Sequence, residues 1–253
     1  MMKANFILLL LCIGLISCNK SALYDRPDSF YEDFESYLDA ESFLGSENFY
    51  HQITYTESYM EIDTHIVFEG TRSMKFFGKG TKNNVLSKCS FSHHKLALPE
   101  KETVTVSAWY YIDTEDELPW LFLMDMEENV AIGAGPGIRV YISDNNSLGI
   151  NFKYLEPNIE QDTANQMTVP RKEWFKISMT AYLSQKDNGW IKLYQNDTLV
   201  IDAQNIQTLP KDILYFQQGT KGMYTSAEFG VTANPTDKDV LLWVDAVEVF
   251  VKE

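Results

Sequence analysis

Three segments of this 253-residue chain alternate apolar residues with aromatic, basic or amide ones, over residues 103–112, 138–142 and 148–154. Side chains in a β-strand point alternately to two faces, so each segment predicts a strand with one apolar face. The side chains expected on the other face are those of Trp109, Tyr111, Arg139, Tyr141, Asn151 and Lys153. Aromatic rings stack on the apolar faces of sugars, and basic and amide groups bind sugar hydroxyls and carboxylates. If the three strands are neighbours, the six residues predict a carbohydrate-binding surface; if a loop or a second layer covers them, they are simply packed.

The rest of the chain predicts the elements that must position these residues. Period-two patterns and turn residues predict further strands over residues 49–56, 66–69, 73–77, 85–91, 174–181, 189–195, 199–204, 213–217 and 240–251. The only helix expected is a short one within residues 32–43. Many short strands separated by turns are typical of an all-β, two-sheet antiparallel β-sandwich. With no Pro-rich or Gly-rich linker inside, residues 31–253 are predicted to form a single domain.

The N-terminal segment has the pattern of an export signal. Lys3 precedes an apolar run that is too short to span a bilayer. The run ends in Leu15-Ile16-Ser17-Cys18, which resembles the bacterial lipobox, in which the cysteine is acylated. This resemblance implies a signal peptide over residues 1–17, lipidation of Cys18 and a polar tether over residues 18–30. The expected location is the bacterial cell envelope, at the outer membrane, with the facing side left open.

Composition excludes several classes of function. The 36 acidic and 21 basic residues give a formal net charge of -15, which argues against nucleic acid as a partner. Only Cys89 remains once Cys12 is removed and Cys18 is acylated, so no internal disulfide is expected. The sequence has no Gly-rich phosphate loop, nucleophile elbow or Cys/His metal spacing.

Three further stretches together resemble the concanavalin A-like (laminin G-like) jelly-roll superfamily. They are Gly70-Thr71-Arg72-Ser73-Met74-Lys75-Phe76, residues 104–111, and residues 173–179 followed by 187–196. In two places, Asp162-Thr163-Ala164 and Asp197-Thr198-Leu199, the chain is also similar to the O-glycosylation motif of Bacteroidota. These resemblances imply a jelly-roll fold and an envelope protein of a glycan-foraging bacterium.

The C-terminal part is similar to the end of heparin-lyase-like polysaccharide lyases. Residues 217–224 match a strand that carries a catalytic Tyr and a nearby Lys in that family, which implies these roles for Tyr224 and Lys221. The chain departs from the family in having Thr225 in place of an Arg, and Lys221 three rather than four residues before Tyr224. A lyase acting on a uronate needs a cation for the carboxylate, a base and an acid. His93 or its neighbour His94 is the candidate base, and only one of them can address a given sheet face.

A Ca²⁺ site is a separate expectation. Glu35 and Asp245 resemble carboxylates that bind a structural Ca²⁺ in some jelly-roll modules, and oxygen ligands from distant segments suit this ion. Solvated carboxylates are the alternative, so no cofactor is assigned.

The function predicted from the sequence is binding of a polysaccharide chain on the concave sheet face by a lipid-anchored protein. One alternative is a lyase that cleaves a uronate-containing glycan by β-elimination, and another is a non-catalytic adhesion or scaffold module. The sugar and the oligomeric state stay open.

Overall fold

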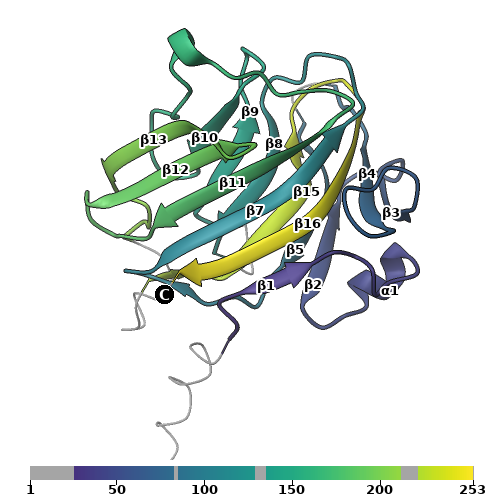
Figure 1. Ribbon diagram of the computed structural model, residues 1–253, viewed down its shortest axis with the longest axis horizontal. Coiled ribbons are helices and arrows are strands. Elements are labelled where there is room, and N and C mark those ends of the chain that lie inside the picture. The colour runs from purple at the N-terminus through teal and green to yellow at the C-terminus, as the bar shows by residue number, and fades with distance from the viewer. Residues whose placement is uncertain (1–25, 83–84, 129–134, 212–221, 253) are drawn as a thin grey trace, which may run out of the picture.

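The computed structural model describes residues 26–82, 85–128, 135–211 and 222–252. Two antiparallel sheets lie one behind the other in a sandwich, which confirms the predicted all-β, two-sheet fold (Figure 1). Cys18 and Lys221 lie outside the described residues. Within the described ranges, no helix is both long and apolar enough to cross a bilayer.

The first sheet has eight strands. Seven follow the spatial order β13 (Thr198–Ile206), β12 (Gly189–Gln195), β11 (Trp174–Tyr182), β7 (Thr103–Ile112), β16 (Val240–Lys252), β4 (Ser73–Gly78) and β3 (Tyr59–Asp63). The eighth, β1 (Phe30–Glu32), pairs with β16, so the two ends of the described chain lie side by side.

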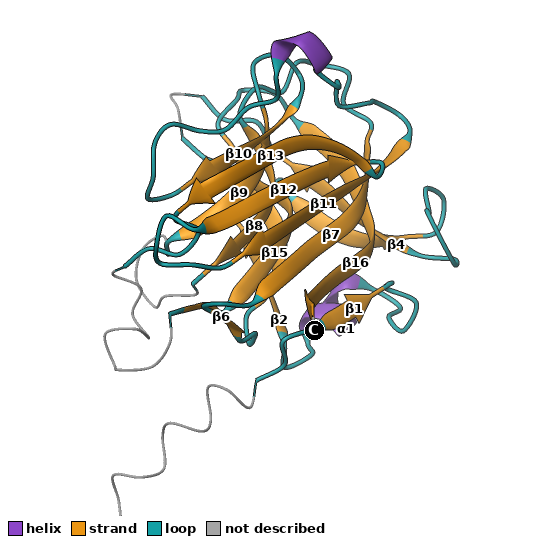
Figure 2. Cartoon of the chain, turned by 60° about the vertical axis from the view of Figure 1, so that its left-hand side comes forward, coloured by secondary structure: helices purple, strands orange, loops and turns teal. Residues whose placement is uncertain are grey.

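The second sheet has six strands, in the order β10 (Leu148–Phe152), β9 (Gly137–Ile142), β8 (Leu121–Glu127), β15 (Ser226–Asn234), β5 (Ser87–His93) and β2 (Phe49–Ile53). A small third sheet pairs β14 (Met223–Tyr224) with β6 (Leu98–Pro99). The helical elements are α1 (Ala40–Leu44) and a 3₁₀ turn over Thr163–Asn165, at the margins of the strand layers (Figure 2).

Alternation in the sequence produces the strands as expected. In β11 and β12, buried and half-buried residues alternate along the whole strand. The predicted hairpin is formed by β9 and β10, and its turn is closed by the Ser143 N–H, which donates to the Ser147 carbonyl (2.8 Å). The predicted strand at residues 66–69 is wrong, because this segment forms a loop. The predicted strand at residues 213–217 lies outside the described residues.

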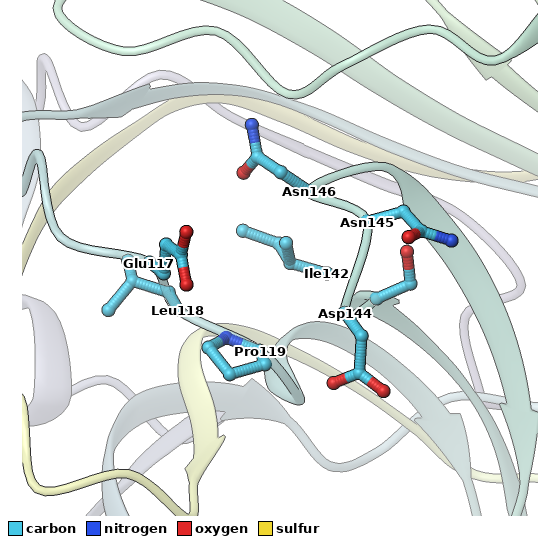
Figure 3. A pocket seen from close by; sticks show the side chains of 8 residues that line it. Glu117, Leu118, Pro119, Ile142, Asp144, Asn145 and Asn146 are labelled. Atoms are coloured by element: carbon cyan, nitrogen blue, oxygen red, sulfur yellow. The ribbon is translucent and has the colours of Figure 1, made fainter.

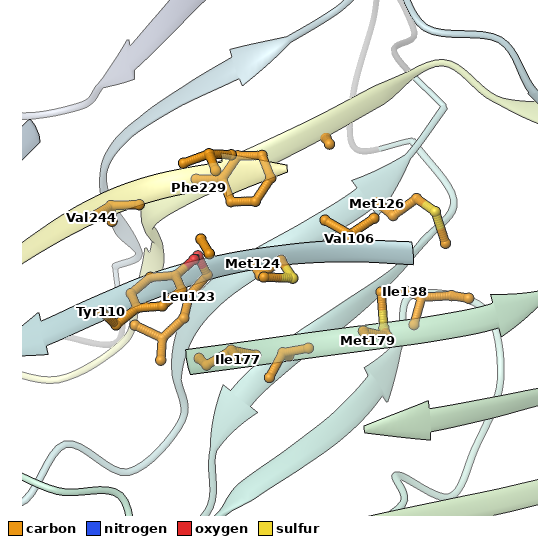
Figure 4. Close-up of a cluster of buried hydrophobic side chains, with 14 of the residues drawn as sticks. Val106, Tyr110, Leu123, Met124, Met126, Ile138, Ile177, Met179, Phe229 and Val244 are labelled. Carbon is orange, nitrogen blue, oxygen red and sulfur yellow. The ribbon is translucent and has the colours of Figure 1, made fainter. Parts of the chain in front are cut away.

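The core fills the space between the two sheets with side chains from both. Figure 4 shows Val106 and Ile177 of the eight-stranded sheet packed with Met124, Ile138 and other residues of the six-stranded sheet. The Tyr110 hydroxyl, buried in this layer, donates to the carbonyl of Leu123 across it (2.8 Å). Such a bond satisfies a polar group that burial alone would penalise.

Strand register defines two ends of the sandwich. Thr103 lies opposite Lys252, and Phe30 lies opposite Val249, which puts the beginning and the end of the described chain at one end. Ile112 lies opposite Leu242, so the loops after β7 and before β16 are at the other end. We call these the terminal end and the loop end.

Candidate functional site

A single row of polar side chains crosses the outer face of the six-stranded sheet. Its members are register partners on successive strands, in the order Tyr50, Ser92, Glu228, Asp125, Arg139 and Asn151. The residues before and after them in each strand, such as Phe91, Phe229 and Met124, point into the core. Five inter-strand steps of about 4.8 Å make this polar row roughly 24 Å long. Of its members, Tyr50 and Arg139 are half-buried, and Ser92, Glu228, Asp125 and Asn151 are buried.

Ion pairs connect the polar row to neighbouring charges on the same face. The Lys153 ammonium lies 3.3 Å from an Asp125 carboxylate oxygen and also pairs with Glu127. The Lys88 ammonium lies 3.5 Å from a Glu228 oxygen, which also accepts a hydrogen bond from Ser90. We call the polar row together with Lys88, Glu127 and Lys153 the polar face. It carries three acidic and three basic groups.

The Arg139 guanidinium is held by two residues. Its Nε donates to the Asn151 side-chain oxygen (2.8 Å), and its plane lies over the Phe122 ring, 3.8 Å from the centroid. The Asn151 amide in turn donates to Asn158 (2.6 Å). These contacts fix the orientation of the guanidinium, and burial lowers its pKa without discharging it.

Burial shifts the acidic groups of the polar face strongly. Glu228 is 1% exposed, and burial raises its pKa to about 7, against the attraction of Lys88. Burial and the nearby Asp125 raise the pKa of Glu127 as well. For Lys153, burial alone would lower the pKa, but the carboxylates of Asp125 and Glu127 outweigh it and raise the pKa. Glu228 is therefore the carboxyl group placed to exchange a proton near neutral pH.

One oxygen of Glu228 has no hydrogen-bond partner among the described residues. Its Oε2 is buried and makes no hydrogen bond, whereas Oε1 accepts from Ser90 and pairs with Lys88. Two strands along the polar row, the Tyr50 hydroxyl is half-buried, and burial followed by the charge of Glu228 raises its pKa. The two environments therefore differ, since Tyr50 stays protonated and Glu228 ionises near neutrality.

The structure brings four of the six predicted binding residues together. Arg139, Tyr141, Asn151 and Lys153 lie on or beside the polar face. Trp109 and Tyr111 do not, because β7 belongs to the other sheet, between β11 and β16. The prediction of one surface for all six is wrong for these two.

Trp109 and Tyr111 are packed among aromatic rings on the outer side of the eight-stranded sheet. The indole of Trp109 stacks on Phe68 with centroids 3.7 Å apart. The Tyr111 ring contacts those of Trp174 and Trp243, with centroids 5.7 and 5.6 Å apart. For these two residues, the alternative interpretation from the sequence therefore holds, in which the aromatic side chains are packed under a loop.

His93 points into the core rather than onto the polar face. Its ring stacks on Phe30 with centroids 4.7 Å apart, and burial lowers its pKa to about 4. The neighbouring His94 is half-buried and lies edge-on to Tyr50, 5.4 Å between centroids. Of the two histidines, it is therefore His94 that adjoins the polar row.

Tyr224 is completely buried. Its hydroxyl donates to the Thr208 carbonyl (2.8 Å) and lies 3.1 Å from the Tyr154 hydroxyl. Burial raises its pKa well above the usual value. This geometry gives Tyr224 a place in the core and does not support the predicted role in proton transfer.

The two candidate Ca²⁺ ligands are occupied by the loop that follows β3. Asp245 accepts from the N–H groups of Phe68 (3.0 Å) and Glu69 (3.3 Å), and Glu35 accepts from Thr71 and Arg72. In the described part of the chain, no group of three or more acidic, His or Cys side chains is placed to hold a metal ion. The described residues therefore provide no set of ligands for the predicted Ca²⁺ site.

Comparison with known proteins places the chain among carbohydrate-active folds. A family model described as polysaccharide lyase matches residues 42–248. No curated protein sequence matches the chain.

Three solved structures share the fold. An endo-β-1,4-glucuronan lyase from the fungus Trichoderma reesei is 14% identical with a TM-score of 0.62, over 88% of this chain and 95% of that one. The alginate lyase Aly36B is 10% identical with a TM-score of 0.58, over 89% and 97% of the two chains. A marine alginate lyase from Aplysia kurodai is 13% identical with a TM-score of 0.56, over 88% and 98%.

Proposed function

Since the chain belongs to the polysaccharide lyase family, we propose that it cleaves a uronate-containing polysaccharide by β-elimination on its polar face. The observation that carries this proposal is the polar row, in which a fixed cation, an ionisable carboxyl group and a protonated phenol share one sheet face. These are the three groups that removal of a proton beside a carboxylate requires.

The proposed roles follow from the position of each group. Lys153, which lies beside Asp125 and Glu127, neutralises the uronate carboxylate, which makes the neighbouring C–H proton acidic. Arg139, about four strand spacings from Tyr50, binds the carboxylate of a neighbouring unit of the chain. Glu228 takes this proton, and its buried carboxyl group must turn towards the substrate to do so. The electron pair forms a carbon–carbon double bond as the bond to the glycosidic oxygen breaks, and Tyr50 donates a proton to that oxygen.

Relatives of known activity support the substrate class. The Trichoderma reesei enzyme is described as a glucuronan lyase and the two others as alginate lyases. Glucuronan and alginate are both built of uronate units, which are the units that Arg139 and Lys153 are placed to neutralise.

The test is incubation of the folded mature domain with alginate, glucuronan and other uronate polymers. Each elimination creates an unsaturated uronate end, so we expect ultraviolet absorbance to rise on at least one polymer. Absorbance that stays flat on every polymer overturns the proposal.

Binding without cleavage is the second candidate, and one observation favours it. The cations Lys88 and Lys153 are already paired with carboxylates of the polar face, so a substrate carboxylate must compete with them. Retention of the protein in a gel containing a polymer that it does not cleave would favour this candidate.

We also propose that the chain is a lipoprotein of the bacterial envelope, anchored through Cys18. The support is the segment Leu15-Ile16-Ser17-Cys18, which lies outside the described residues.

A further inference from the structure

A second hydrophobic cluster lies on the outer side of the six-stranded sheet, apart from the core. It consists of Phe122, Tyr141 and Ala233, with Trp120 packed against them. The Trp120 and Tyr141 rings are stacked, with centroids 4.9 Å apart and 15° between their planes. The Arg139 guanidinium lies on the Phe122 ring. The cluster therefore adjoins the polar row on the side nearer the loop end of the sandwich.

The backbone is adapted to hold this pair of rings. Trp120 has a φ of 63°, in the left-handed region that bulky residues rarely adopt. Across the sheet, Gly149 is the register partner of Tyr141, and a Cβ on it would lie 2.7 Å from the tyrosine ring. Trp120 thus has a strained backbone conformation, and the Tyr141 ring on which it stacks fits only because residue 149 is a glycine. Backbone strain of this kind is concentrated at functional sites.

Tyr141 is fully buried, whereas Trp120 is half-buried. One face of the indole is covered by Tyr141, so the accessible part belongs to its other face and edge. An indole held flat by a second ring is a rigid platform, and the apolar C–H face of a pyranose is the complementary surface.

Charges of both signs lie near this platform. Arg139 stacks on Phe122, and Glu160 accepts a hydrogen bond from the Tyr141 hydroxyl (3.1 Å). Burial raises the pKa of Tyr141, and the charges of Glu160 and Asp144 raise it further. Leu118 and Pro119, which precede Trp120 in the chain, line a pocket of about 200 Å³, where Figure 3 shows the carboxylates of Glu117 and Asp144. A sugar carboxylate would be repelled here, whereas sugar hydroxyls find acceptors.

We propose that Trp120 stacks on a pyranose ring without a carboxylate, as an outer subsite for the chain bound along the polar row. This inference rests on the proposed function and deepens it, since it predicts a polymer in which uronates alternate with neutral sugars. The uronate occupies the positions near Arg139, and the neutral ring lies over Trp120.

The test compares Trp120→Gly with Trp120→Phe and with Trp190→Ala, a half-buried tryptophan of the other sheet. Glycine accepts a positive φ, so Trp120→Gly removes the ring and also relieves the strained backbone. The readouts are the thermal midpoint and retention in gels containing hyaluronan, in which glucuronate alternates with N-acetylglucosamine, or alginate, which contains only uronates.

We expect Trp120→Gly to bind hyaluronan about tenfold more weakly, with a smaller loss on alginate and a cooperative thermal transition that shows the variant is folded. Trp120→Phe should recover most of the affinity, and Trp190→Ala should behave as wild type. Unchanged hyaluronan binding in Trp120→Gly overturns the subsite, and an equal or larger loss on alginate overturns the assignment of a neutral ring.

The outcomes also separate the subsite from the lyase reaction. Weaker hyaluronan binding in Trp120→Gly, with no cleavage by the wild type, keeps the subsite and overturns the reaction. Cleavage by the wild type with unchanged binding in the variant overturns the subsite alone. A wild-type protein that binds neither polymer overturns the subsite.

Discussion

Glu228 on β15 and Asp125 on β8 are register partners, and both carboxyl groups are buried on the same face of the sheet. The two carboxyl groups differ in their hydrogen bonds and ion pairs. Asp125 accepts from Thr232 (2.8 Å) and pairs with Lys153, whereas Glu228 keeps one oxygen without a partner. Burial raises the pKa of Glu228 to about 7, so this carboxyl group can release and take up a proton near neutral pH.

Glu228→Gln should remove lyase activity and its pH dependence. The pKa of Glu228 is raised to about 7, so the base is ionised only above that pH. We expect kcat/KM of the wild type to rise as pH increases through about 7, and the variant to lose at least about 100-fold. Initial rates of unsaturated-end formation between pH 5 and 9 measure both. A variant with the wild-type profile would show that another group is the base.

The same substitution should change how stability depends on pH. The folded pKa of Glu228 lies above its ordinary value of 4.5, so between these values the folded protein binds more protons than the unfolded one. This group therefore makes the protein less stable as pH rises from 4.5 to about 7. Urea unfolding should show Glu228→Gln gaining stability relative to wild type over that window. The exposed Glu115, whose pKa is lowered by Lys172, provides the control variant Glu115→Gln, which should show no such gain.

Arg139→Lys should impair the reaction although it keeps the positive charge. Lysine keeps the charge but cannot hold Asn151 through Nε while lying flat on Phe122. We expect kcat/KM to fall about 10-fold to 100-fold in Arg139→Lys and further in Arg139→Ala. Lys192→Ala, on the opposite sheet, should keep wild-type kinetics. Equal activity of Arg139→Ala and wild type would exclude Arg139 from the site.

His93→Phe should protect the domain against acid. Burial lowers the pKa of His93 to about 4 from 6.5, so the unfolded chain binds more protons between these values. The wild type loses stability as pH falls from 6.5 to 4, by about 1.4 kcal/mol for each pH unit at most. A phenylalanine stacked on Phe30 removes this loss. Thermal midpoints at pH 4.5 and 7 measure the difference, and the opposite sign would contradict the core position of His93.

Tyr224→Phe should cost stability and spare activity. The hydroxyl satisfies the Thr208 carbonyl inside the fold, and losing this hydrogen bond costs about 1 kcal/mol. We expect a lower urea midpoint and kcat within about twofold of wild type, because the Tyr224 hydroxyl is bonded to Thr208 and Tyr154 within the core. Abolished activity in a folded variant would restore Tyr224 as a proton donor.

Much of the fold could be predicted because its strands alternate. The pattern predicted β7, β9, β10, β11, β12 and β16 to within a residue or two. It also placed Arg139, Asn151 and Lys153 on a common side. A single sequence does not say which strands are neighbours, so Trp109 and Tyr111 were assigned to the wrong sheet.

The central part of the polar row was missed for a physical reason. Strands β8 and β15 are buried on both faces, so their burial carries no period of two. β15 is built of small and polar residues, and Asp125 and Glu127 end an apolar run. The buried carboxyl groups of Glu228 and Asp125 were the available signal, since each interrupts a strand-like segment with a charge that must find partners.

The arrangement of the two ends has a consequence for a lipid-anchored chain. The Ala97 N–H donates to the Pro27 carbonyl, so β5, like β16, finishes beside the point where the tether enters the domain. If Cys18 is acylated as proposed, the terminal end is the one tethered to the bilayer, and the polar row runs across the strands rather than along them towards that end. A long glycan could then bind through an internal stretch of its chain, and no free end would have to point towards the membrane.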